Sequence, residues 1–442
     1  MKSINRRIFL QGSSAAVIVS STIKQAKAAS ANDKVILGVM GCGGRGVRLL
    51  HFLLQRDDVE IKYLCDANSR MFATALEELD SADAPRPKTV TDFREILDDP
   101  EVDALVNATP DHWHALATVM ACQAGKDVYV EKPLAVDINE GRKMVEAARK
   151  YDRVVQVGTQ TRSAAYVHDA REYIQSGGLG DVYMVKVFNM MQHPARPKGA
   201  NRPVPQGLDW DLWCGPAPLV PYAPGRWWFE RWDFSCGGIF GDAIHQLDLA
   251  RMMLDLEYPS AISQVGGVRH FTDGREIPDT QVATFEFGDI TMVFEAGLWM
   301  PYMKKIPNSI RDSDQHPEWR FCSTHVEILG TDAMMFFGRQ GGGWQVFDIN
   351  NTEPVLTTYG RQADREHIAE FISCMHSRKK PIADIEEGHR STLLAHLANT
   401  SYRVGNQRLL FDSGTEQYTN CAEANKLLKR SYREPWVLKD QV

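Results

Sequence analysis

The sequence predicts an α/β fold. An N-terminal doubly wound parallel sheet is followed by an α+β domain with an open, mostly antiparallel sheet. From residue 34 to about residue 156, short apolar runs alternate with helical stretches, as in parallel strands joined by helices. After Gly158 the apolar segments are longer, partly alternating, and separated by few helices. That pattern is typical of an antiparallel sheet.

The individual elements follow from these patterns in chain order. In the first part, strands are expected at 35–40, 61–65, 104–108, 127–130 and 154–157. Helices are expected between them, including 92–97, 114–124 and 138–150. In the second part, strands are expected at 182–190, 261–268, 280–287, 291–298 and 325–330. Residues 364–377 and 388–405 are expected to be helical, and the aromatic segment 210–240 to be an ordered loop over the site.

The first expected strand ends in a glycine turn of the pattern GxGxxG, which opens a helical segment. Gly41 allows the tight turn, Gly43 lets the backbone approach a pyrophosphate, and Gly46 lets helix and strand pack closely. Phosphates would bind the free N–H groups at the helix N-terminus. The sequence therefore predicts a dinucleotide-binding Rossmann unit. The contacts expected from this turn are Gly41, Cys42, Gly43, Gly44, Arg45 and Gly46.

An acidic residue, Asp66, follows the second expected strand. A carboxylate at this place accepts hydrogen bonds from a ribose diol and repels a 2′-phosphate, so NAD is favoured over NADP. Arg70 lies about one helical turn further on and would soften that preference. Asp66 also suits the N-cap of the next helix, and the two roles are compatible.

Residues 1–30 are expected to be an export signal and not part of the fold. Arg6 and Arg7 form a twin arginine followed by Phe-Leu, a moderately apolar run covers 15–23, and Ala26-Lys27-Ala28 offers a cleavage site. The segment resembles a twin-arginine (Tat) signal and predicts a periplasmic location. The alternative is a short anchor or a basic arm. Because Tat export moves folded proteins, such a protein would load its nucleotide before export.

The composition of the chain limits the classes of partner that the protein is expected to bind. The formal net charge is −7 and the chain has no basic block, so nucleic acid is not expected as a partner. No later apolar run reaches transmembrane length, so no membrane association is expected after processing. The eight cysteines show no CxxC or metal-like spacing and are read as mostly buried free thiols.

The expected division of the chain is a signal at 1–30, a nucleotide-binding domain at 33–157, a substrate and oligomerisation domain at 158–412, and a tail at 413–442.

Four further motifs complete the pattern. They are Thr109-Pro110-Asp111-His112-Trp113-His114, Glu131-Lys132-Pro133, Gly158-Thr159-Gln160-Thr161-Arg162, and the segment 237–248 with Asp242 and His245. The first three follow expected strands, at the carboxyl edge where ligands bind. Together with the glycine turn, the set resembles the Gfo/Idh/MocA oxidoreductases, which include glucose–fructose oxidoreductase and inositol dehydrogenase. The resemblance covers residues 34 to about 412 and implies a cis-like turn at Lys132-Pro133.

Three residues suit the interconversion of an alcohol and a ketone. The site needs a base near neutral pKa and a cation that stabilises the developing alkoxide. His245 suits the base, Lys132 the cation, and Asp242 a group that holds a hydroxyl or orients the imidazole. The resemblance implies the same roles. Family members commonly place the Asp one position earlier, where this chain has Gly241, so the role of Asp242 stays open.

Structural roles compete with these assignments. Lys132 could be a surface lysine, His245 a satisfied helix histidine, and Asp242 only a helix N-cap. Further expected cofactor contacts are Thr109, Pro110, His114, Glu131, Lys132 and Gln160, with Trp113 near the adenine. Expected substrate contacts are Arg162, Trp228 and Trp232, although both tryptophans suit a core equally well, and Trp210 and Trp213 are expected in the core. No metal site is expected, because a zinc pair of His112 and His114 lacks a third ligand.

The predicted function is an exported oxidoreductase that transfers a hydride between tightly bound NAD(H) and a secondary hydroxyl or ketone of a sugar or polyol. The alternative is an NAD-dependent glycoside hydrolase or lyase that acts through a transient keto-sugar. It ranks second because the sequence around His245 differs from that of the best-known glycosidase branch. A nucleotide-containing binding protein is a third reading, which the presence of Lys132 and His245 disfavours. A homo-oligomer is expected, since another subunit should cover the open sheet.

Overall fold

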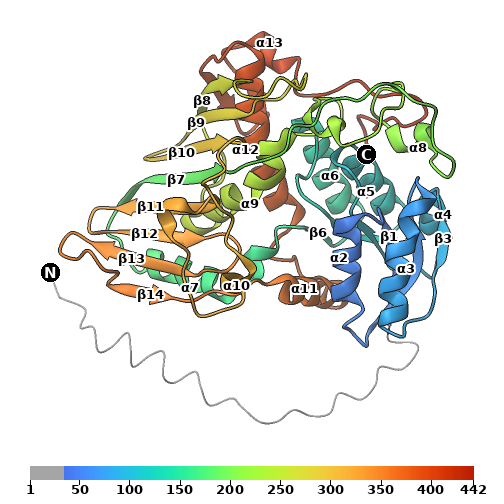
Figure 1. Ribbon diagram of the computed structural model, residues 1–442, viewed down its shortest axis with the longest axis horizontal. Coiled ribbons are helices and arrows are strands. Elements are labelled where there is room, and N and C mark those ends of the chain that lie inside the picture. The colour runs from blue at the N-terminus through green and yellow to red at the C-terminus, as the bar shows by residue number, and fades with distance from the viewer. Residues whose placement is uncertain (1–33) are drawn as a thin grey trace, which may run out of the picture. The chain divides into compact units, whose positions relative to one another are not determined.

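Two β-sheets organise the protein. The computed structural model describes residues 34–442 (Figure 1). The first sheet has six parallel strands in the order β3-β2-β1-β4-β5-β6. The strand order reverses between β1 and β4, and in open α/β sheets a ligand crevice lies at such a reversal, outside the carboxyl ends of the strands. The predicted N-terminal Rossmann sheet is confirmed.

Helices on both faces of this sheet explain why its central strands are apolar. All residues of β4 and β5 are buried. The strands are β1 (Val35–Met40), β2 (Val59–Cys65), β3 (Lys88–Val90), β4 (Ala104–Asn107), β5 (Asp127–Val130) and β6 (Val155–Val157). The helices and 3-10 turns are α2 (Gly44–Leu53), η1 (Ser69–Met71), α3 (Phe72–Ser81), α4 (Arg94–Leu97), η2 (Asp111–Trp113), α5 (His114–Gln123), α6 (Ile138–Lys150) and η3 (Gln160–Ser163).

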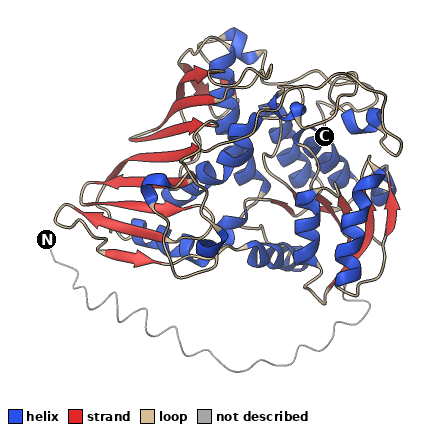
Figure 2. Ribbon diagram, in the orientation of Figure 1, coloured by secondary structure: helices blue, strands red, loops and turns tan. Residues whose placement is uncertain are grey.

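The second sheet has ten strands in the order β14-β13-β12-β11-β7-β10-β9-β8-β15-β16. All neighbouring pairs are antiparallel except β7 and β10, which run parallel, so the predicted mostly antiparallel sheet is confirmed. Helices gather on the side of this sheet that faces the first sheet (Figure 2). The opposite face exposes the apolar side chains of Met184, Val265 and Val282. In the part of the chain that the structure describes, no helix is long and apolar enough to cross a membrane.

The remaining elements belong to this second part. The strands are β7 (Val182–Met190), β8 (Ala261–Gly267), β9 (Thr280–Phe287), β10 (Ile290–Gly297), β11 (His325–Gly330), β12 (Ala333–Gly338), β13 (Trp344–Asp348), β14 (Leu356–Thr358), β15 (Leu409–Asp412) and β16 (Gln417–Tyr418). The helices and 3-10 turns are α7 (Ala165–Gln175), α8 (Trp210–Cys214), η4 (Trp227–Glu230), α9 (Gly237–Leu254), α10 (Asn308–Arg311), η5 (Trp319–Phe321), α11 (Asp364–Ser377), α12 (Ile385–Arg403) and α13 (Ala422–Asn425).

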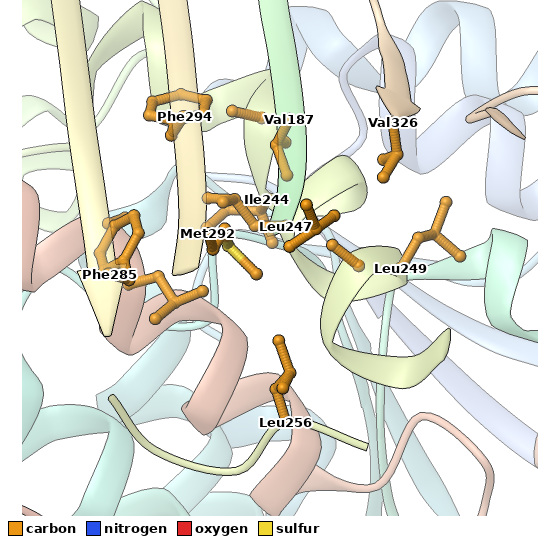
Figure 3. Packing of buried hydrophobic residues seen from close by; sticks show 14 of the residues in the cluster. Val187, Ile244, Leu247, Leu249, Leu256, Phe285, Met292, Phe294 and Val326 are labelled. Atoms are coloured by element: carbon orange, nitrogen blue, oxygen red, sulfur yellow. The ribbon is translucent and has the colours of Figure 1, made fainter. Parts of the chain in front are cut away.

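Helix α9 is fixed against the ten-stranded sheet by a large apolar core. Figure 3 shows Ile244 and Leu247 of the helix packed beside Val187 of β7, Met292 of β10 and neighbouring strand residues. Almost every residue of α9 is buried, because α12 and α7 also pack against it. A helix held on several sides gives its polar residues fixed positions, which matters for the cleft described below.

The last part of the chain is built into the fold. The expected tail 413–442 adds β16 to the ten-stranded sheet, and Trp436 is buried in the core of the first sheet together with Leu438 and Val442. The boundaries of the expected domains stay a prediction, since 35–442 forms one unit by contacts. The expected export signal lies outside the described residues.

Candidate active site

A cleft of about 760 Å³ runs from the carboxyl ends of the first sheet to helix α9. We call its two halves the Rossmann side and the α9 side. The Rossmann side is lined by Gly41, Gly43, Gly44, Arg45, Asp66, Asn68, Thr109, Pro110, Glu131 and Lys132. The α9 side is lined by His193, Arg196, Arg226, Trp228, Phe229, Gly238, Gly241, Asp242 and Lys305. The polar motifs expected at the strand ends therefore meet residues of the second part of the chain.

The glycine turn has the shape that a pyrophosphate requires. Gly41 adopts φ +92°, and a Cβ there would lie 2.7 Å from the backbone of Ala108. A Cβ on Gly46 would lie 1.9 Å from the carbonyl oxygen of Gly41, so helix α2 could not pack this closely with any side chain there. A Cβ on Gly43, in contrast, would meet nothing within 4 Å. The turn is closed towards the protein and open towards the cleft, which fits a nucleotide phosphate.

Asp66 lies at the end of β2 with both carboxylate oxygens held by backbone. Its Oδ2 accepts a hydrogen bond from the N–H of Cys42 at 2.9 Å, and its Oδ1 accepts one from the N–H of Asn68 at 2.9 Å. Burial raises the pKa of the Asp66 carboxyl, and the two N–H donors oppose that shift. Each oxygen keeps acceptor capacity for a ribose hydroxyl. This geometry fits the predicted diol contact.

A strap from the second part of the chain closes the outer end of the cleft. We define the strap as residues 207–217. It pairs with the segment after β2, where Ser69 N–H donates to Gly207 O at 2.7 Å and Asp209 N–H donates to Ala67 O at 2.8 Å. Leu212 and Trp213 of the strap line a smaller cavity together with Asp66 and Trp113. Trp113 lines this smaller cavity, and its expected place near an adenine stays a prediction. Trp213 packs against a small core cluster, as expected, and also lines both cavities.

The EKP motif places two charges at the inner end of the Rossmann side. Glu131 accepts a hydrogen bond from Arg45 Nε at 2.6 Å, and Arg45 also pairs with Asp364 at 3.4 Å. Burial raises the pKa of the Glu131 carboxyl, but Arg45 and Lys132 outweigh this, so the pKa is lowered. Gln160 donates to Glu131 at 3.3 Å and to Tyr129 at 3.0 Å.

Lys132 connects the first sheet with α9. Its Nζ donates to the carbonyl oxygen of Gly241 at 2.7 Å, in the first turns of that helix. The Lys132-Pro133 peptide bond is cis, as the resemblance implied. Burial lowers the pKa of the Lys132 ammonium, while Glu131 and Asp242 act in the opposite direction. The ammonium lines the cleft and is not a surface lysine.

Asp242 is the centre of a cluster of cations. Lys305 Nζ donates to its Oδ1 at 2.8 Å, and Arg339 Nη1 lies 3.1 Å from the same oxygen. Burial would raise the pKa of the Asp242 carboxyl, but Arg339, Lys305 and Lys132 hold it well below its usual range. Its Oδ2 is buried without a hydrogen-bond partner. Asp242 does not cap the helix, which has no side-chain cap hydrogen bond.

His245 follows one helical turn later and is buried at 6% exposure. Burial lowers the pKa of its imidazole well below the usual range, and Arg339, Lys132, Arg45 and Lys305 lower it further. The ring is therefore neutral at neutral pH, and its Nδ1 has no hydrogen-bond partner. A neutral imidazole with a free nitrogen can accept a proton. The satisfied-histidine alternative does not fit this unpartnered Nδ1.

Seven expected site residues do not line the cleft: Cys42 and Gly46 of the glycine turn, His114, Gln160, Arg162, Trp232 and His245. Arg162 is buried in an ion pair with Asp248 at 2.7 Å and lines a different cavity, so the structure does not bring it to the cleft. Trp232 packs near Tyr402 at a centroid distance of 6.4 Å and lines a different, small cavity. The ring nitrogens of His114 lie 2.7 Å from Pro133 O and 2.9 Å from Thr109 O, and the side chain of Gln160 donates to Glu131. His114 and Gln160 thus hold neighbouring residues in place.

Sequence reasoning missed five basic residues of the α9 side. His193, Arg196, Arg226 and Lys305 line the cleft, and Arg339 contacts Asp242. All five belong to loops or strand ends of the second part, where no spacing motif marks them. Trp228, which was expected, lines the cleft beside Phe229. Among the described residues, no cluster of three or more His, Cys, Asp or Glu could hold a metal.

Three family models match consecutive parts of the chain. Residues 35–159 match "Oxidoreductase family, NAD-binding Rossmann fold", residues 167–336 match "GFO/IDH/MocA C-terminal domain", and residues 329–438 match "Oxidoreductase family, C-terminal alpha/beta domain". The matches together span both sheets and the cleft between them.

Similar proteins come from several bacteria. A glycosyl hydrolase family 109 protein of Stenotrophomonas maltophilia is 35% identical over 146 residues, 32% of this chain and 32% of that protein. A 1,5-anhydro-D-fructose reductase of Ensifer adhaerens is 28% identical over 314 residues, 68% of this chain and 78% of that protein. The chain aligns with only about a third of the first two curated relatives, 32% and 37% of their lengths.

The fold is shared with solved structures. The WlbA dehydrogenase of Bordetella pertussis, crystallised with NADH and UDP-GlcNAcA, superposes with a TM-score of 0.62 at 20% identity. The superposition covers 86% of this chain and 99% of that one. With the three family models and the glycine turn, this likeness leads to one conclusion: the chain belongs to the Gfo/Idh/MocA oxidoreductase family and carries that family's NAD-binding Rossmann domain.

Proposed function

We propose that the protein transfers a hydride between tightly bound NAD(H) and a secondary hydroxyl or ketone of a sugar or polyol. The observation that carries the proposal is the bond from Lys132 Nζ to the carbonyl of Gly241, 2.7 Å long. It brings the cation at the end of β5 to the helix turn that holds Asp242 and His245. A cation and a carboxylate thus line the inner end of the nucleotide cleft, and the neutral imidazole of His245 lies buried one helical turn further along α9.

These residues divide the acid–base work. NAD, when bound, supplies the acceptor for the hydride. His245 Nδ1 accepts the hydroxyl proton, because the ring is neutral and that nitrogen is unpartnered. The Lys132 ammonium stabilises the negative charge that grows on the same oxygen. Asp242 Oδ2, also unpartnered, accepts a hydrogen bond from a second hydroxyl and fixes the orientation of the sugar.

The strap supports a nucleotide that stays bound. It covers the cavity beside Asp66 and Trp113 and is itself held by Arg433, whose Nε donates to Gly215 O at 3.1 Å. The twin arginine at positions 6 and 7 supports export to the periplasm, where free NAD is absent. A retained nucleotide must be recycled within the catalytic cycle, so oxidation of one substrate is coupled to reduction of another.

A second candidate function is hydrolysis or elimination at a glycoside through a transient keto-sugar. The similarity to a glycosyl hydrolase family 109 protein, 35% identical over 146 residues, favours it. That alignment covers only 32% of each chain, so it does not reach all of the cleft. The similarity to 1,5-anhydro-D-fructose reductase is more extensive and supports net redox chemistry.

One experiment separates the two functions. The holoprotein is mixed with a panel of sugars and glycosides without added nucleotide, and nicotinamide absorbance and products are followed. We expect one stoichiometric conversion of the bound nucleotide, then a stall until a carbonyl acceptor is added. Repeated turnover of a glycoside alone would instead establish the hydrolase. Deuterium on the oxidised carbon would then return to the same product, and deuterium on the neighbouring carbon would exchange into water.

We also propose that the open face of the ten-stranded sheet pairs with a second subunit. Met184 of β7, Val265 of β8 and Val282 of β9 expose 37%, 64% and 40% of their surface, and β8 pairs with β9. Apolar side chains on a broad sheet face are unusual for a monomer. Analytical ultracentrifugation of the wild type and of Val265→Glu tests this, and a monomeric wild type would contradict it.

A further inference from the structure

The α9 side of the cleft holds more cations than its carboxylates neutralise. Asp242 is the carboxylate shared by Lys305 and Arg339, at 2.8 and 3.1 Å. Lys132 also lowers the pKa of Asp242, but Glu131 lies beside Lys132 and balances it. One positive charge of the Lys305 and Arg339 pair is therefore left over.

Arg226 adds a second uncompensated charge. Its guanidinium lies over the rings of Phe229 at 5.4 Å and Trp228 at 5.9 Å. No carboxylate of the described residues forms an ion pair with it, and the side chain is exposed to the cleft. A guanidinium stacked on an aromatic ring keeps its donors free for a planar anion.

The charged residues between Asp242 and Arg226 do not neutralise this excess of positive charge. Arg196 pairs with Glu230 at 2.6 Å, and Arg275 pairs with Asp273 at 2.8 Å and with Glu230 at 3.5 Å, so these two cations are balanced by two carboxylates. Burial lowers the pKa of Arg196, Glu230 opposes this shift, and Arg226 and Arg275 lower the pKa further. His193 has its pKa lowered to about 4, mainly by burial and then by Arg196 and Lys305, so it is neutral. The excess positive charge of Arg226 and of the Lys305 and Arg339 pair therefore remains and favours an anion.

We propose that the substrate carries an anionic group, a carboxylate or a phosphate, which Arg226 and Lys305 bind. This assignment rests on the proposed function, since it names the class of sugar that the same cleft takes. Asp242 Oδ2 and His245 Nδ1 remain available to accept hydrogen bonds from hydroxyl groups of the same sugar. Because Lys305 lies 2.8 Å from Asp242 Oδ1, the anion lies beside the acceptor atoms, and one molecule engages both. The cleft rejects an uncharged sugar because the cations then stay uncompensated.

The test measures binding to the holoprotein by calorimetry, with pairs of related ligands that differ in charge. The pairs are D-glucuronate with its methyl ester, D-galacturonate with its methyl ester, and D-glucose 6-phosphate with D-glucose. We expect at least one acid to bind about 10- to 100-fold more tightly than its neutral partner, the range of charge-assisted hydrogen bonds. The uronate and phosphate pairs show which anion is preferred.

Two variants locate the effect. Arg226→Gln should reduce the preference for the acid about 10-fold without unfolding the protein, because the side chain is exposed. Lys304→Gln removes the same charge one residue from Lys305, outside the cleft lining, and should leave the preference unchanged. Raising the salt concentration should weaken binding of the acid and spare its neutral partner.

The outcomes also separate this inference from the proposed function. Equal affinities within every pair, no affinity for any acid, or an unchanged preference in Arg226→Gln would overturn the anionic substrate. Nicotinamide absorbance, recorded in the same samples, reports hydride transfer. Preferential binding of an acid without any absorbance change would support the anion site and refute the oxidoreductase. Conversion of neutral sugars alone would support the oxidoreductase and refute the anion site.

Discussion

Lys305 Nζ donates a hydrogen bond to Asp242 Oδ1 at 2.8 Å and joins residues that are 63 positions apart in sequence. The bond links the loop after β10 to helix α9. With Arg339 on the same oxygen, it keeps Asp242 ionised although the carboxyl is buried. The acid of the candidate site is thus held in its charged form by groups that no motif marks.

The Lys305 bond should stabilise the fold in a pH-dependent way. Because the pKa of folded Asp242 lies below its ordinary value of 3.8, the stabilisation is present above that value and is lost as pH falls through the lowered pKa. Lys305→Gln should cost about 0.5–1 kcal/mol of unfolding free energy at neutral pH, since Lys305 is partly exposed. Urea unfolding at several pH values measures this. The loss should shrink at acid pH, and Lys304→Gln should show none.

Lys132→Met should abolish turnover without loss of nucleotide. We expect turnover to fall about 100-fold or more, the scale of a positioned charge stabiliser. The nucleotide released on denaturation should stay near one per chain, because the glycine turn and Asp66 are untouched. Quenched-flow assays and mass spectrometry of the denatured protein check both values. Near-normal turnover would remove Lys132 from the mechanism.

The pH profile should carry the signature of His245. Burial, Arg339 and Lys132 lower its pKa well below the ordinary 6.5, so kcat/KM should stay constant through neutral pH and fall only well below pH 6.5. The value of kcat/KM falls at acid pH because the neutral imidazole is the base, and protonation of the ring removes that base. His245→Gln should lower turnover about 100-fold, and the kcat/KM of this variant should no longer fall at acid pH. A fall of kcat/KM that begins at pH 6.5 or above in the wild type would contradict the assignment of His245 as the base.

Asp66→Ala should change nucleotide choice. The loss of a charged acceptor for the ribose diol should weaken NAD about 10- to 100-fold, as expected for one to two charge-assisted hydrogen bonds. NADP should bind no worse, because the repulsion of its 2′-phosphate disappears. Titration of nucleotide-free protein with each dinucleotide gives the ratio. Asp92→Ala, which removes a nearby half-buried acid paired with Arg94, serves as a control and should leave the ratio unchanged.

Arg162→Met should destabilise the protein and spare the chemistry. It leaves the Asp248 carboxylate, 1% exposed, without the guanidinium at 2.7 Å. Breaking a buried pair by removing one partner typically costs about 3–5 kcal/mol. Guanidinium unfolding should show a loss of this size. The KM of the folded enzyme should not change, whereas a selective rise in KM would restore Arg162 as a substrate contact.

Sequence patterns specified the first sheet well because its strands are short, buried and followed by recognisable turns. β1, β5 and helix α6 lie where they were expected. β3 was missed because it has three residues, two of them exposed, and carries no apolar run. The parallel pairing of β7 with β10 was also not foreseen, since strand order depends on contacts distant in sequence.

Some residues of the candidate site could likewise be predicted from the sequence, and others could not. Residues in strand-end motifs, such as Glu131 and Lys132, reached the cleft because β-strand topology fixes where strands end. Arg162 followed such a motif too, but its side chain turned into the interior to meet Asp248. Arg226 and Lys305 come from irregular loops, whose course depends on tertiary packing. No local spacing encodes that course.

The strap gives the end of the chain a part in building the nucleotide site. Arg430 donates to the carbonyl of His112 across 318 positions, and Trp436 packs edge-on against Trp113 at 5.0 Å. Arg433 holds Gly215 of the strap. During synthesis the Rossmann strands emerge early, but the wall beside the adenine is finished only when these late residues dock. Assembly of that wall therefore couples residues that are more than 300 positions apart in sequence.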